Sequence, residues 1–355
     1  AATLVLTVAG VVSLGGLQMG EDWRRASPVA PFDVTAEPIE PHGPTAPPVV
    51  ASVQPRENKI DLDLRSGNQL WTADGKRLAL TGVGEVTRIY RVPGGWVYGG
   101  AAEVRLMRPD GTSRTLIRTG DRWIVSPDGA RIAAMIGDAL RVGRIDDSSM
   151  VVQASAAVPA GTKPVVFAGN GVVVARASSS GYGLLDPARP TAPAWNRDIL
   201  AVFGRHGSGL AALVRRAGRD APCLAVLKAV PGLPVSRAGT CGGELTDATE
   251  AGLSPNGSWL ATSASNGVSL VDLARAASGQ PATTRCAVRP SVAPVWAGST
   301  IVTADERGLV RCYPNGRQEV VPPPAGIAAG WQLVPALEPA PAAPATTRPR
   351  PTTAT

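Results

Sequence analysis

Turn signals recur through the middle of the 355-residue chain at a nearly constant spacing. Each signal contains a glycine and is followed by two short apolar stretches, as in SPDGARIAAMIGDALRVGRID from Ser126 and SPNGSWLATSASNGVSLVDL from Ser254. The glycines at equivalent places are Gly95, Gly129, Gly171, Gly209, Gly257 and Gly298, and the intervals between them are 34, 42, 38, 48 and 41 residues. A period near forty residues indicates a chain built from stacked copies of one supersecondary unit.

Each unit is predicted to form a sheet of short strands. The Asp-Gly and Asn-Gly pairs supply the positive φ that a tight hairpin turn needs. The stretch after the turn, Ile132-Ala133-Ala134 or Leu260-Ala261-Thr262, is small and apolar, as expected of a strand packed between neighbouring sheets. The stretch after that is expected to alternate, with the apolar residues Val268, Leu270 and Leu273 set against the polar residues Ser269 and Asp272. Such a unit matches one blade of a β-propeller, a sheet that is stable only in a ring.

Segments on either side of the six repeats supply one further blade. Residues 60–82 contain three strand-like pieces, and residues 326–334 contain one more. Pairing the N-terminal strands with a C-terminal strand closes a ring without an exposed sheet edge at the joint. We therefore expect an all-β propeller over residues 58–334 with seven blades, and with six as the alternative count. Two stacked β-sandwich domains would also use short strands, but they have no reason to keep this spacing over six units.

The SPDG turn at Ser126 and the SPNG turn at Ser254, each followed by a small apolar strand, resemble the repeats of WD40-type and TolB-like bacterial propellers. The resemblance covers residues 58–334. The Trp-Asp dipeptide that ends many WD40 repeats is missing, and so is the Gly-His pair at their start. The resemblance therefore implies the architecture and no particular family member.

The N-terminal segment, residues 1–19, is uncharged and consists mostly of Ala, Val, Leu and Gly. A helix of this length would reach about 28 Å, just enough to cross the apolar part of a bilayer. We interpret it as a transmembrane signal anchor. A signal-peptide hydrophobic region and a buried strand are the alternatives, although neither a basic start nor a small-residue cleavage site is present. Arg24 and Arg25 follow the segment and favour the cytoplasmic side, whereas the cysteines favour the opposite side.

Proline-rich segments flank the predicted propeller. Residues 20–57 form a predicted extended linker, because eight prolines between Pro28 and Pro55 exclude a helix. Residues 335–355 contain six prolines and one bulky aliphatic side chain, Leu337, and form a predicted disordered tail. His42, one of two histidines, lies in the linker, where we expect no fixed catalytic or metal site.

The four cysteines predict two disulfides. Cys223 and Cys241 are each nine residues from Gly232, the centre of a predicted turn, so an antiparallel hairpin would place them opposite each other. Cys286 and Cys312 would then form the second bridge, between one blade and the next. The sequence has no Cys-x-x-Cys pair of the kind typical of zinc sites, and reduced buried cysteines are the alternative. Disulfides would place the propeller in the periplasm or outside the cell.

The net charge of +7 comes from arginines and a few lysines that are dispersed along the chain, the densest group being Arg215, Arg216 and Arg219. A basic protein is attracted to anionic surfaces. Nucleic-acid surfaces, however, usually interleave aromatic residues with a basic stripe, and aromatic residues make up only 4% of this chain. We therefore expect no nucleic-acid partner.

Motifs for catalysis or cofactor binding are missing from the sequence. There is no phosphate-binding Gly-x-x-x-x-Gly-Lys-Ser/Thr, no Gly-x-Ser-x-Gly elbow and no His-Glu-x-x-His helix. His206 is the one histidine of the predicted propeller and lies in a predicted turn, where a solvated side chain is the more common case. Asp74, Asp110 and Asp128 precede glycines in turns and are explained by bonds to the backbone. We predict no catalytic, cofactor-binding or metal-ligating residue.

Together these features favour a non-enzymatic interaction protein. We expect a single-pass protein of the inner (cytoplasmic) membrane, anchored through residues 1–19, with its propeller in the periplasm or outside the cell. Its expected partners are other protein subunits, for which it would act as a scaffold or accessory subunit of a secretion, pilus or respiratory complex. The alternative is an extracytoplasmic propeller that senses a small ligand. A hydrolase or lyase that uses loop carboxylates is the least expected.

Overall fold

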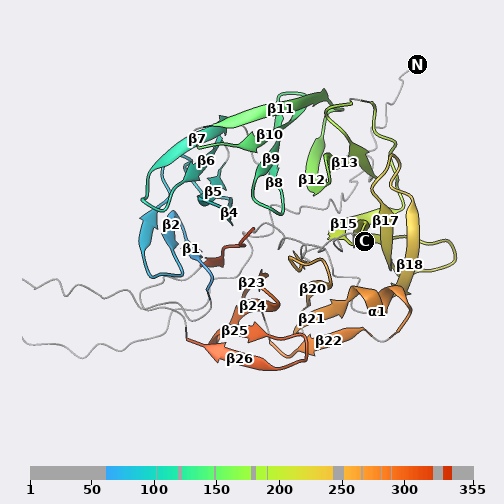
Figure 1. Ribbon diagram of the computed structural model, residues 1–355. Coiled ribbons are helices and arrows are strands. Elements are labelled where there is room, and N and C mark those ends of the chain that lie inside the picture. The colour runs from blue at the N-terminus through green and yellow to red at the C-terminus, as the bar shows by residue number, and fades with distance from the viewer. Residues whose placement is uncertain are drawn as a thin grey trace, which may run out of the picture.

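The computed structural model describes residues 61–337 apart from 101, 119–121, 148, 177–180, 190, 243–251, 265–266, 281, 289 and 323–330. In this part of the chain, seven antiparallel sheets stand as blades around a central axis (Figure 1). The protein is therefore an all-β, seven-bladed propeller, as the sequence predicts, and the six-bladed alternative is wrong. The predicted membrane segment, residues 1–19, and the predicted linker, residues 20–57, lie outside the described residues.

We number the blades in chain order and give their strands from the centre outward. Blade 1 contains β27 (Gln332–Leu333), β1 (Leu64–Ser66), β2 (Gln69–Trp71) and β3 (Arg77–Ala79). Blade 2 contains β4 (Arg88–Val92), β5 (Gly95–Gly99), β6 (Glu103–Met107) and β7 (Ser113–Arg118). Blade 3 contains β8 (Trp123–Val125), β9 (Arg131–Ile136), β10 (Ala139–Ile145) and β11 (Met150–Ala157). Blade 4 contains β12 (Thr162–Ala168), β13 (Gly171–Arg176) and β14 (Gly181–Leu185).

The second half of the ring has the same plan and one insertion. Blade 5 contains β15 (Ile199–His206), β16 (Gly209–Val214), β17 (Cys223–Lys228) and β18 (Val235–Cys241). Blade 6 contains β19 (Gly252–Leu253), β20 (Trp259–Ala264), β21 (Gly267–Asp272) and β22 (Thr283–Cys286), with helix α1 (Leu273–Ala277) between its last two strands. Blade 7 contains β23 (Val292–Ala297), β24 (Thr300–Asp305), β25 (Gly308–Cys312) and β26 (Gln318–Val321).

The six repeat glycines all lie where the first strand of a blade turns into the second. Gly129 and Gly257, in the SPDG and SPNG turns, both have a φ of 69°, as the turn chemistry predicts. Two of the six differ: positive φ is carried two residues earlier, by Gly169 and Gly207, and the second strand begins at Gly171 and Gly209. In these two blades the turn therefore lies at the same place in the sheet, but a different glycine carries the positive φ.

The core lies between the blades rather than within one of them. Ile132, Ala133 and Ala134 of β9 are fully buried, as expected for a second strand covered on both faces. One apolar cluster joins Ala133 of blade 3 to Phe167 and Val172 of blade 4, and similar clusters lie at the other contacts between blades. Small side chains at these positions allow neighbouring sheets to approach closely.

The predicted alternation in the third strand of blade 6 is wrong. Val268, Ser269 and Leu270 are all at most 3% exposed, because neighbouring blades cover both faces of β21. Leu273 lies outside the strand and begins helix α1, with Asp272 as the residue before it. A sheet buried on both faces has no reason to alternate between apolar and polar residues.

The ring closes in blade 1, where the C-terminal β27 pairs with the N-terminal β1 as predicted. The register places Leu64 opposite Leu333, and the Val334 amide donates to the carbonyl oxygen of Asp63 at 2.9 Å. Arg65 adds a side-chain connection: its guanidinium donates to Gln332 Oε1 at 3.1 Å from Nε and to the carbonyl of Val86 at 2.8 Å from Nη1. Residues from both ends of the domain therefore hold this blade together.

A buried carboxylate joins the closing blade to its neighbour. Asp63 is 1% exposed, and its two oxygens accept from the Ala73 amide at 2.7 Å and from Trp96 Nε1, in blade 2, at 2.6 Å. Arg91 of β4 lies 3.7 Å from the same carboxylate. A buried charge is stable only when it is hydrogen-bonded or paired. Here the hydrogen bond from Trp96 and the ion pair with Arg91 both come from blade 2.

The chain continues in order past the predicted end of the propeller at residue 334. Residues 335–337, which we assigned to the tail, run parallel to β4: Arg91 donates from its amide to the carbonyl of Pro335, and the Leu337 amide donates to the carbonyl of Arg91, both at 2.8 Å. Leu337 also packs on the apolar cluster of blades 2 and 3. The first residues of the tail therefore cover the inner edge of blade 2, and residues 338–355 lie outside the described part.

Among the described residues, no helix combines the length and the apolar character needed to span a bilayer.

Removing the closing strand should destabilise the whole ring. A chain that ends at Trp331 loses the β27–β1 pairing and the burial of Leu333 and Val334, which are 6% and 1% exposed. At roughly 1.5–3 kcal/mol for each buried side chain, we expect the thermal midpoint to fall by about 10 °C or more. Thermal unfolding followed by circular dichroism measures the change. The control chain ends at Leu337 and keeps every described contact, so equal midpoints for the two chains would contradict this account of closure.

Candidate functional site

Two exposed features of the molecule depart from the repeating plan of the ring. One is a pocket in the cleft between blades 5 and 6, which we call the 5/6 pocket; it is lined by His206, Ala211, Leu224, Ala225, Val226, Arg237, Gly239, Leu273 and Ala277. The other is the outer edge of blade 3, formed by β11. The pocket carries basic side chains on an apolar wall, and the edge carries unpaired backbone groups.

The pairing of strands in blade 5 places three pocket residues in one row. Ala211 on β16 pairs with Val226 on β17, and Val226 pairs with Arg237 on β18. Directly paired residues of antiparallel strands project from the same face of a sheet. The row therefore presents a small residue, a branched aliphatic and a guanidinium to blade 6, with Leu224 in the neighbouring row belonging to the apolar cluster between the two blades.

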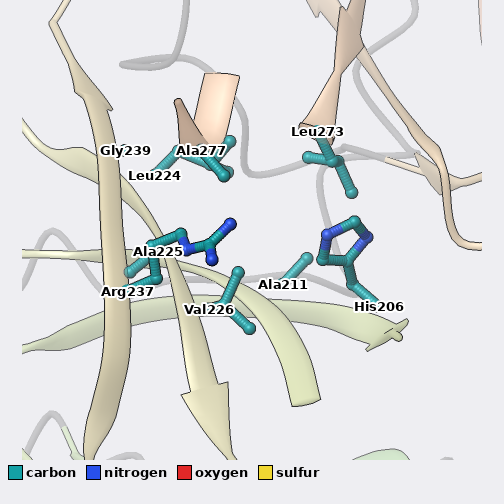
Figure 2. Close-up of a pocket in the computed structure, with 9 residues that line it drawn as sticks. All are labelled: His206, Ala211, Leu224, Ala225, Val226, Arg237, Gly239, Leu273 and Ala277. Atoms are coloured by element: carbon teal, nitrogen blue, oxygen red, sulfur yellow. The ribbon is translucent and has the colours of Figure 1, made fainter. Parts of the chain in front are cut away.

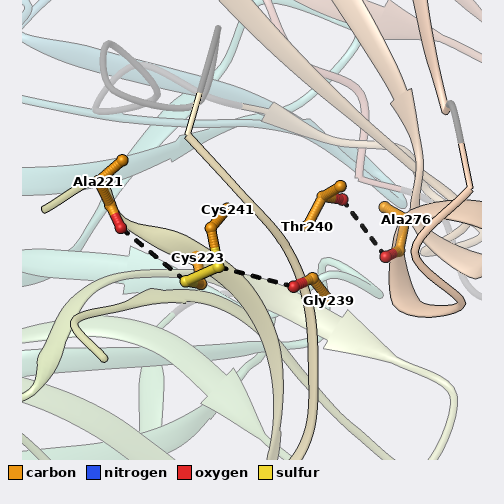
Figure 3. Close-up of a disulfide and its surroundings, with 6 residues drawn as sticks. All are labelled: Ala221, Cys223, Gly239, Thr240, Cys241 and Ala276. Carbon is orange, nitrogen blue, oxygen red and sulfur yellow. Dashed lines mark hydrogen bonds between the residues drawn. A yellow bond between two sulfur atoms is a disulfide. The ribbon is translucent and has the colours of Figure 1, made fainter. Parts of the chain in front are cut away.

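Helix α1 forms the opposite side of the 5/6 pocket. Asp272 caps it: the carboxylate accepts from the amides of Ala274 and Arg275 at 3.0 and 3.1 Å, which satisfies donors that a helix start leaves free. Gly239 lets the helix approach β18, because a Cβ there would lie 2.7 Å from the carbonyl oxygen of Ala276. A hydrogen bond of 3.3 Å from Thr240 Oγ1 to the same carbonyl fixes the contact (Figure 3).

His206 ends β15 and does not occupy the solvated turn position that the sequence predicts. Its Nδ1 lies 2.7 Å from the carbonyl oxygen of Gly257, in the SPNG turn of blade 6. A carbonyl oxygen can only accept, so Nδ1 carries the proton and Nε2 is left free to accept in the neutral ring or to donate in the protonated ring. The side chain therefore connects two blades and retains one unused nitrogen.

The polar side chains of the 5/6 pocket are both basic. Figure 2 shows the Arg237 guanidinium directed toward the His206 ring, with Leu273 and Ala277 on one side of this space and Val226 on the other. Arg237 has no hydrogen bond or ion pair with any residue that the structure describes. The space among these side chains, with the open solvent at its mouth included, amounts to about 230 Å³. The enclosed part is far smaller than a site for a drug-sized ligand.

The outer edge of blade 3 is long and uncharged. β11 has eight residues, MVVQASAA, and most of them are exposed. Val151 and Val152 are 43% and 47% exposed, which is unusual for large apolar side chains in the described part of the molecule. The register shifts between Val142 and Gly143, so Gln153 is an extra residue that divides β11 into two straight pieces.

The other blades protect their outer strands in ways that blade 3 does not. Five of these strands carry a charged side chain: β3 has Arg77, β7 has Arg114 and Arg118, β18 has Arg237, β22 has Arg285, and β26 has Glu319. The outer strand of blade 4, β14, is largely buried and exchanges two backbone bonds with Asn196 through Tyr182. Charge and cover are the usual devices that prevent another strand from adding to an edge.

The first predicted disulfide is present and supports the pocket. Cys223 on β17 and Cys241 on β18 are directly paired in the register, and their Cα atoms lie 3.8 Å apart (Figure 3). The bridge fixes β18, the strand that carries Arg237 and Gly239. Because α1 rests on this strand, the disulfide stabilises one wall of the 5/6 pocket.

The second predicted disulfide joins two blades. Cys286 ends β22 of blade 6 and Cys312 ends β25 of blade 7, and their Cα atoms lie 6.2 Å apart. Both side chains are fully buried in the cluster between these blades. All four cysteines are paired, so the alternative of reduced cysteines is wrong.

The turn aspartates have the backbone roles that the sequence predicts. Asp110 accepts from the hydroxyl and the amide of Thr112, and these bonds hold the pKa of its carboxyl below the usual range. Asp128 accepts from the amide of Ala130 at 3.1 Å. In Asp74 the hydrogen bond from the Thr72 hydroxyl is the main cause of a lowered pKa. These side chains shape hairpins and do not converge on one site.

Within the described ranges, no group of three or more His, Cys, Asp or Glu side chains could hold a metal ion.

Sequence reasoning missed Arg237 and the exposed face of β11. Arg237 could not be singled out among many dispersed arginines, because its neighbours in the pocket come from another blade. The uncharged run MVVQASAA was a visible signal, since every comparable exposed outer strand carries a charge. It becomes informative only once the chain is divided into inner and outer strands.

The disulfides predict a simple chemical result. Alkylation of the denatured full-length chain without reductant should modify no cysteine, and alkylation after reduction should modify all four, as measured by intact mass. Replacing Cys223 and Cys241 by serine should lower the free energy of unfolding by about 3 kcal/mol, because the bridge closes a loop with a sequence separation of 18 residues. Four modified thiols in the unreduced protein would contradict the pairing.

No protein-family model and no curated protein matches this chain. Among solved structures it is similar to a functionally unknown protein from Desulfotomaculum acetoxidans, with 10% identity, a TM-score of 0.49, and coverage of 78% of this chain and 99% of that one. It is also similar to Hsv2 of Kluyveromyces lactis, with 8% identity, a TM-score of 0.40, and coverage of 55% of this chain and 61% of that one. A third similar structure is PorZ, a surface component of the type-IX secretion system of Porphyromonas gingivalis. It has 11% identity, a TM-score of 0.46, and coverage of 68% of this chain and 33% of that one. The chain thus spans less than two thirds of Hsv2 and of PorZ, and the likeness concerns the propeller fold alone.

Proposed function

We propose that this protein is a non-enzymatic scaffold or accessory subunit of an envelope assembly, such as a secretion, pilus or respiratory complex. Its propeller would lie outside the cytoplasm and be tethered to the inner membrane through residues 1–19. The observation that carries the proposal is the exposed, uncharged outer edge of blade 3. A ring in which one described outer strand lacks the charge or cover that the others have is suited to holding another protein chain.

The occupant we propose for this edge is an extended, uncharged segment of a partner protein. Backbone N–H and C=O groups along β11 have no partner strand in the described part, since β11 is the last strand of its sheet. An added strand gains main-chain hydrogen bonds there, and side-chain contacts on the two faces give selectivity. The piece after the bulge, residues 154–157, is as long as β22 or β26, so it can support a strand of the length that the blades themselves use.

The two disulfides support the extracytoplasmic location. Buried structural disulfides form and persist in oxidising compartments and are rare in the cytoplasm. An anchor at residues 1–19 with a proline-rich linker would let the ring reach a partner while the membrane raises its local concentration. Arg24 and Arg25 oppose this orientation, and the disulfides are the stronger argument because they require the oxidising side.

The alternative function, an extracytoplasmic ligand sensor, is favoured by the 5/6 pocket. The pocket has two basic groups and an apolar wall, which is a common pattern in sites for small anionic ligands. Its enclosed space is too small for a whole cofactor or sugar. Catalysis by a hydrolase or lyase ranks third, because the turn carboxylates Asp74, Asp110 and Asp128 each serve their own hairpin.

Site-specific photocrosslinking tests strand addition at blade 3. A benzophenone amino acid replaces Ser155, an exposed residue of β11, in the full-length protein in its native cells. We expect one major crosslinked protein after detergent extraction, with the crosslinks mapping to a single extended segment. Val152→Lys should abolish the adduct, because a lysine on the edge opposes pairing.

Blade 7 provides the matched control. Val320 of β26 has a similar exposure to Val151, 43%, but its strand also carries Glu319. A crosslinker at Val320 should give no comparable adduct, and Val320→Lys should leave the adduct at position 155 unchanged. Any one of three results would overturn the proposal: equal labelling from both positions, no adduct at position 155, or an adduct formed only with a second copy of this chain.

A further inference from the structure

We infer that a partner strand added to β11 bonds to only two of its residues, Ser155 and Ala157, and places an aliphatic side chain against the cluster between blades 3 and 4. This inference rests on the proposed function and deepens it: it names the backbone groups that hold the partner and the kind of side chain that they select. The hydrogen-bond pattern of blade 3 carries it.

Hydrogen bonds at the two ends of β10 fix which of its residues face β11. At one end the Val158 amide donates to the carbonyl of Asp138 at 3.0 Å, across the β10–β11 pair. At the other end the Ile145 amide donates to the carbonyl of Ala130 at 2.9 Å, across the β9–β10 pair. Successive residues of a strand direct their backbone groups to opposite sides. The even-numbered residues of β10 therefore bond to β11, and the odd-numbered residues bond to β9.

The same alternation leaves two residues at the end of β11 with outward-facing backbone groups. Ser155 lies opposite Arg141, and Ala157 lies opposite Ala139. Because Arg141 and Ala139 bond to β9, Ser155 and Ala157 direct their N–H and C=O groups away from β10. β11 is the last strand of its sheet in the described part of the chain. A strand that adds here can exchange both backbone bonds with each of these two residues.

Small side chains leave these backbone groups accessible. Residues 154–157 are Ala, Ser, Ala and Ala, and the loop that follows, residues 158–162, has no charged side chain. The start of β11 differs, because a charged contact lies next to it: Arg108 Nη2 is 3.4 Å from the carboxylate of Asp147 and donates to its carbonyl at 3.3 Å. The piece after the bulge is therefore the part of β11 that an added strand can reach most easily.

The position between the two bonded residues selects an aliphatic side chain. A partner residue opposite Ala156 projects from the same face of the sheet as Ala156. Blade 4 covers this face: Ala156 is 3% exposed and belongs to the apolar cluster that contains Leu140, Val142 and Phe167. An aliphatic side chain beside Ala156 extends this cluster toward the rim, whereas a charged one loses part of its hydration there. We therefore expect Val, Ile or Leu at this position of the partner, between uncharged residues.

Amide hydrogen exchange of the purified full-length protein tests the alternation without a partner. The rates are read residue by residue, by mass spectrometry with electron-transfer fragmentation. The amides of Ser155 and Ala157 should exchange at rates close to those of an unprotected peptide. The amides of Ala156 and Val158, which bond to β10, should exchange at least about tenfold more slowly. Equal rates at these four residues would overturn the inference.

Proline variants separate the outward bonds from the stability of the blade. Proline has no N–H and is tolerated on an edge strand where that group faces solvent. Ala157→Pro should therefore keep the thermal midpoint within about 3 °C of the unchanged protein. Ala156→Pro removes a bond to β10 and should lower the midpoint by about 5 °C or more. Circular dichroism measures both midpoints, and a fall of equal size in the two variants would contradict the alternation.

Blade 7 supplies a matched proline control. In its outer pair the Tyr313 amide donates to the carbonyl of Arg317, so the next bonded pair is Arg311 with Glu319. Val320, the next residue of β26, therefore directs its N–H away from the sheet. Val320→Pro removes an outward N–H from an outer strand, as Ala157→Pro does, but at a different blade.

Photocrosslinking from position 155 of the full-length protein in its native cells provides the decisive comparison. Ala157→Pro should lower the yield of the adduct about tenfold or more, because it removes a donor and opposes pairing, and Val320→Pro should leave the yield unchanged. The crosslinked segment should contain an aliphatic residue in an uncharged run.

The outcomes separate this inference from the proposed function. An adduct that survives Ala157→Pro, is lost in both proline variants or maps to a charged segment would overturn the inference, while blade 3 would remain a docking site. Absence of an adduct in the protein without proline substitutions would overturn the proposed function, and this inference with it.

Discussion

The structure depends on the closure of the ring in blade 1. A blade exposes both faces of its sheet, so each of the seven is stable only because it has a neighbour on either side. The joint consists of a two-residue strand, β27, on β1, and it is strengthened by buried polar groups rather than by length. Arg65 bonds to Gln332 from the other end of the domain, and Asp63 bonds to Trp96 in the next blade. Residues 335–337 then extend the joint along β4.

The blade plan could be predicted from sequence because it follows from local chemistry. A glycine with positive φ, as at Gly129 and Gly257, is required where a hairpin turns tightly, so its spacing reports the length of a blade. The pairing of Cys223 with Cys241 followed from their equal distance to one turn. What could not be predicted depends on contacts between blades: the burial of Ser269, the bond from His206 to blade 6, and the course of the chain after residue 334.

The two exposed features lie on different parts of the ring. β11 lies on the rim of blade 3, and α1 and β18 lie on another side of the ring (Figure 1); residues of these two elements line the 5/6 pocket. Both depart from the repeat. The strand β11 lacks the charge that protects other outer strands. The cleft between blades 5 and 6 contains helix α1, and the other clefts have no helix in the described part. A ring of seven similar blades can change a single blade in this way because the contacts between the other blades remain. The disulfides at blades 5 to 7 add to that rigidity.

Amide hydrogen exchange of the full-length protein, read by mass spectrometry, tests closure most directly. If β27 closes the ring, the amides of Gln332 and Val334, which face β1 in the register, should exchange as slowly as those of a central strand such as β9, because they open only when the whole ring unfolds. Their slow exchange should disappear together with that of β1 when denaturant is added. Fast exchange at residues 332–337 in a ring whose other blades stay protected would contradict closure by the C-terminal strand.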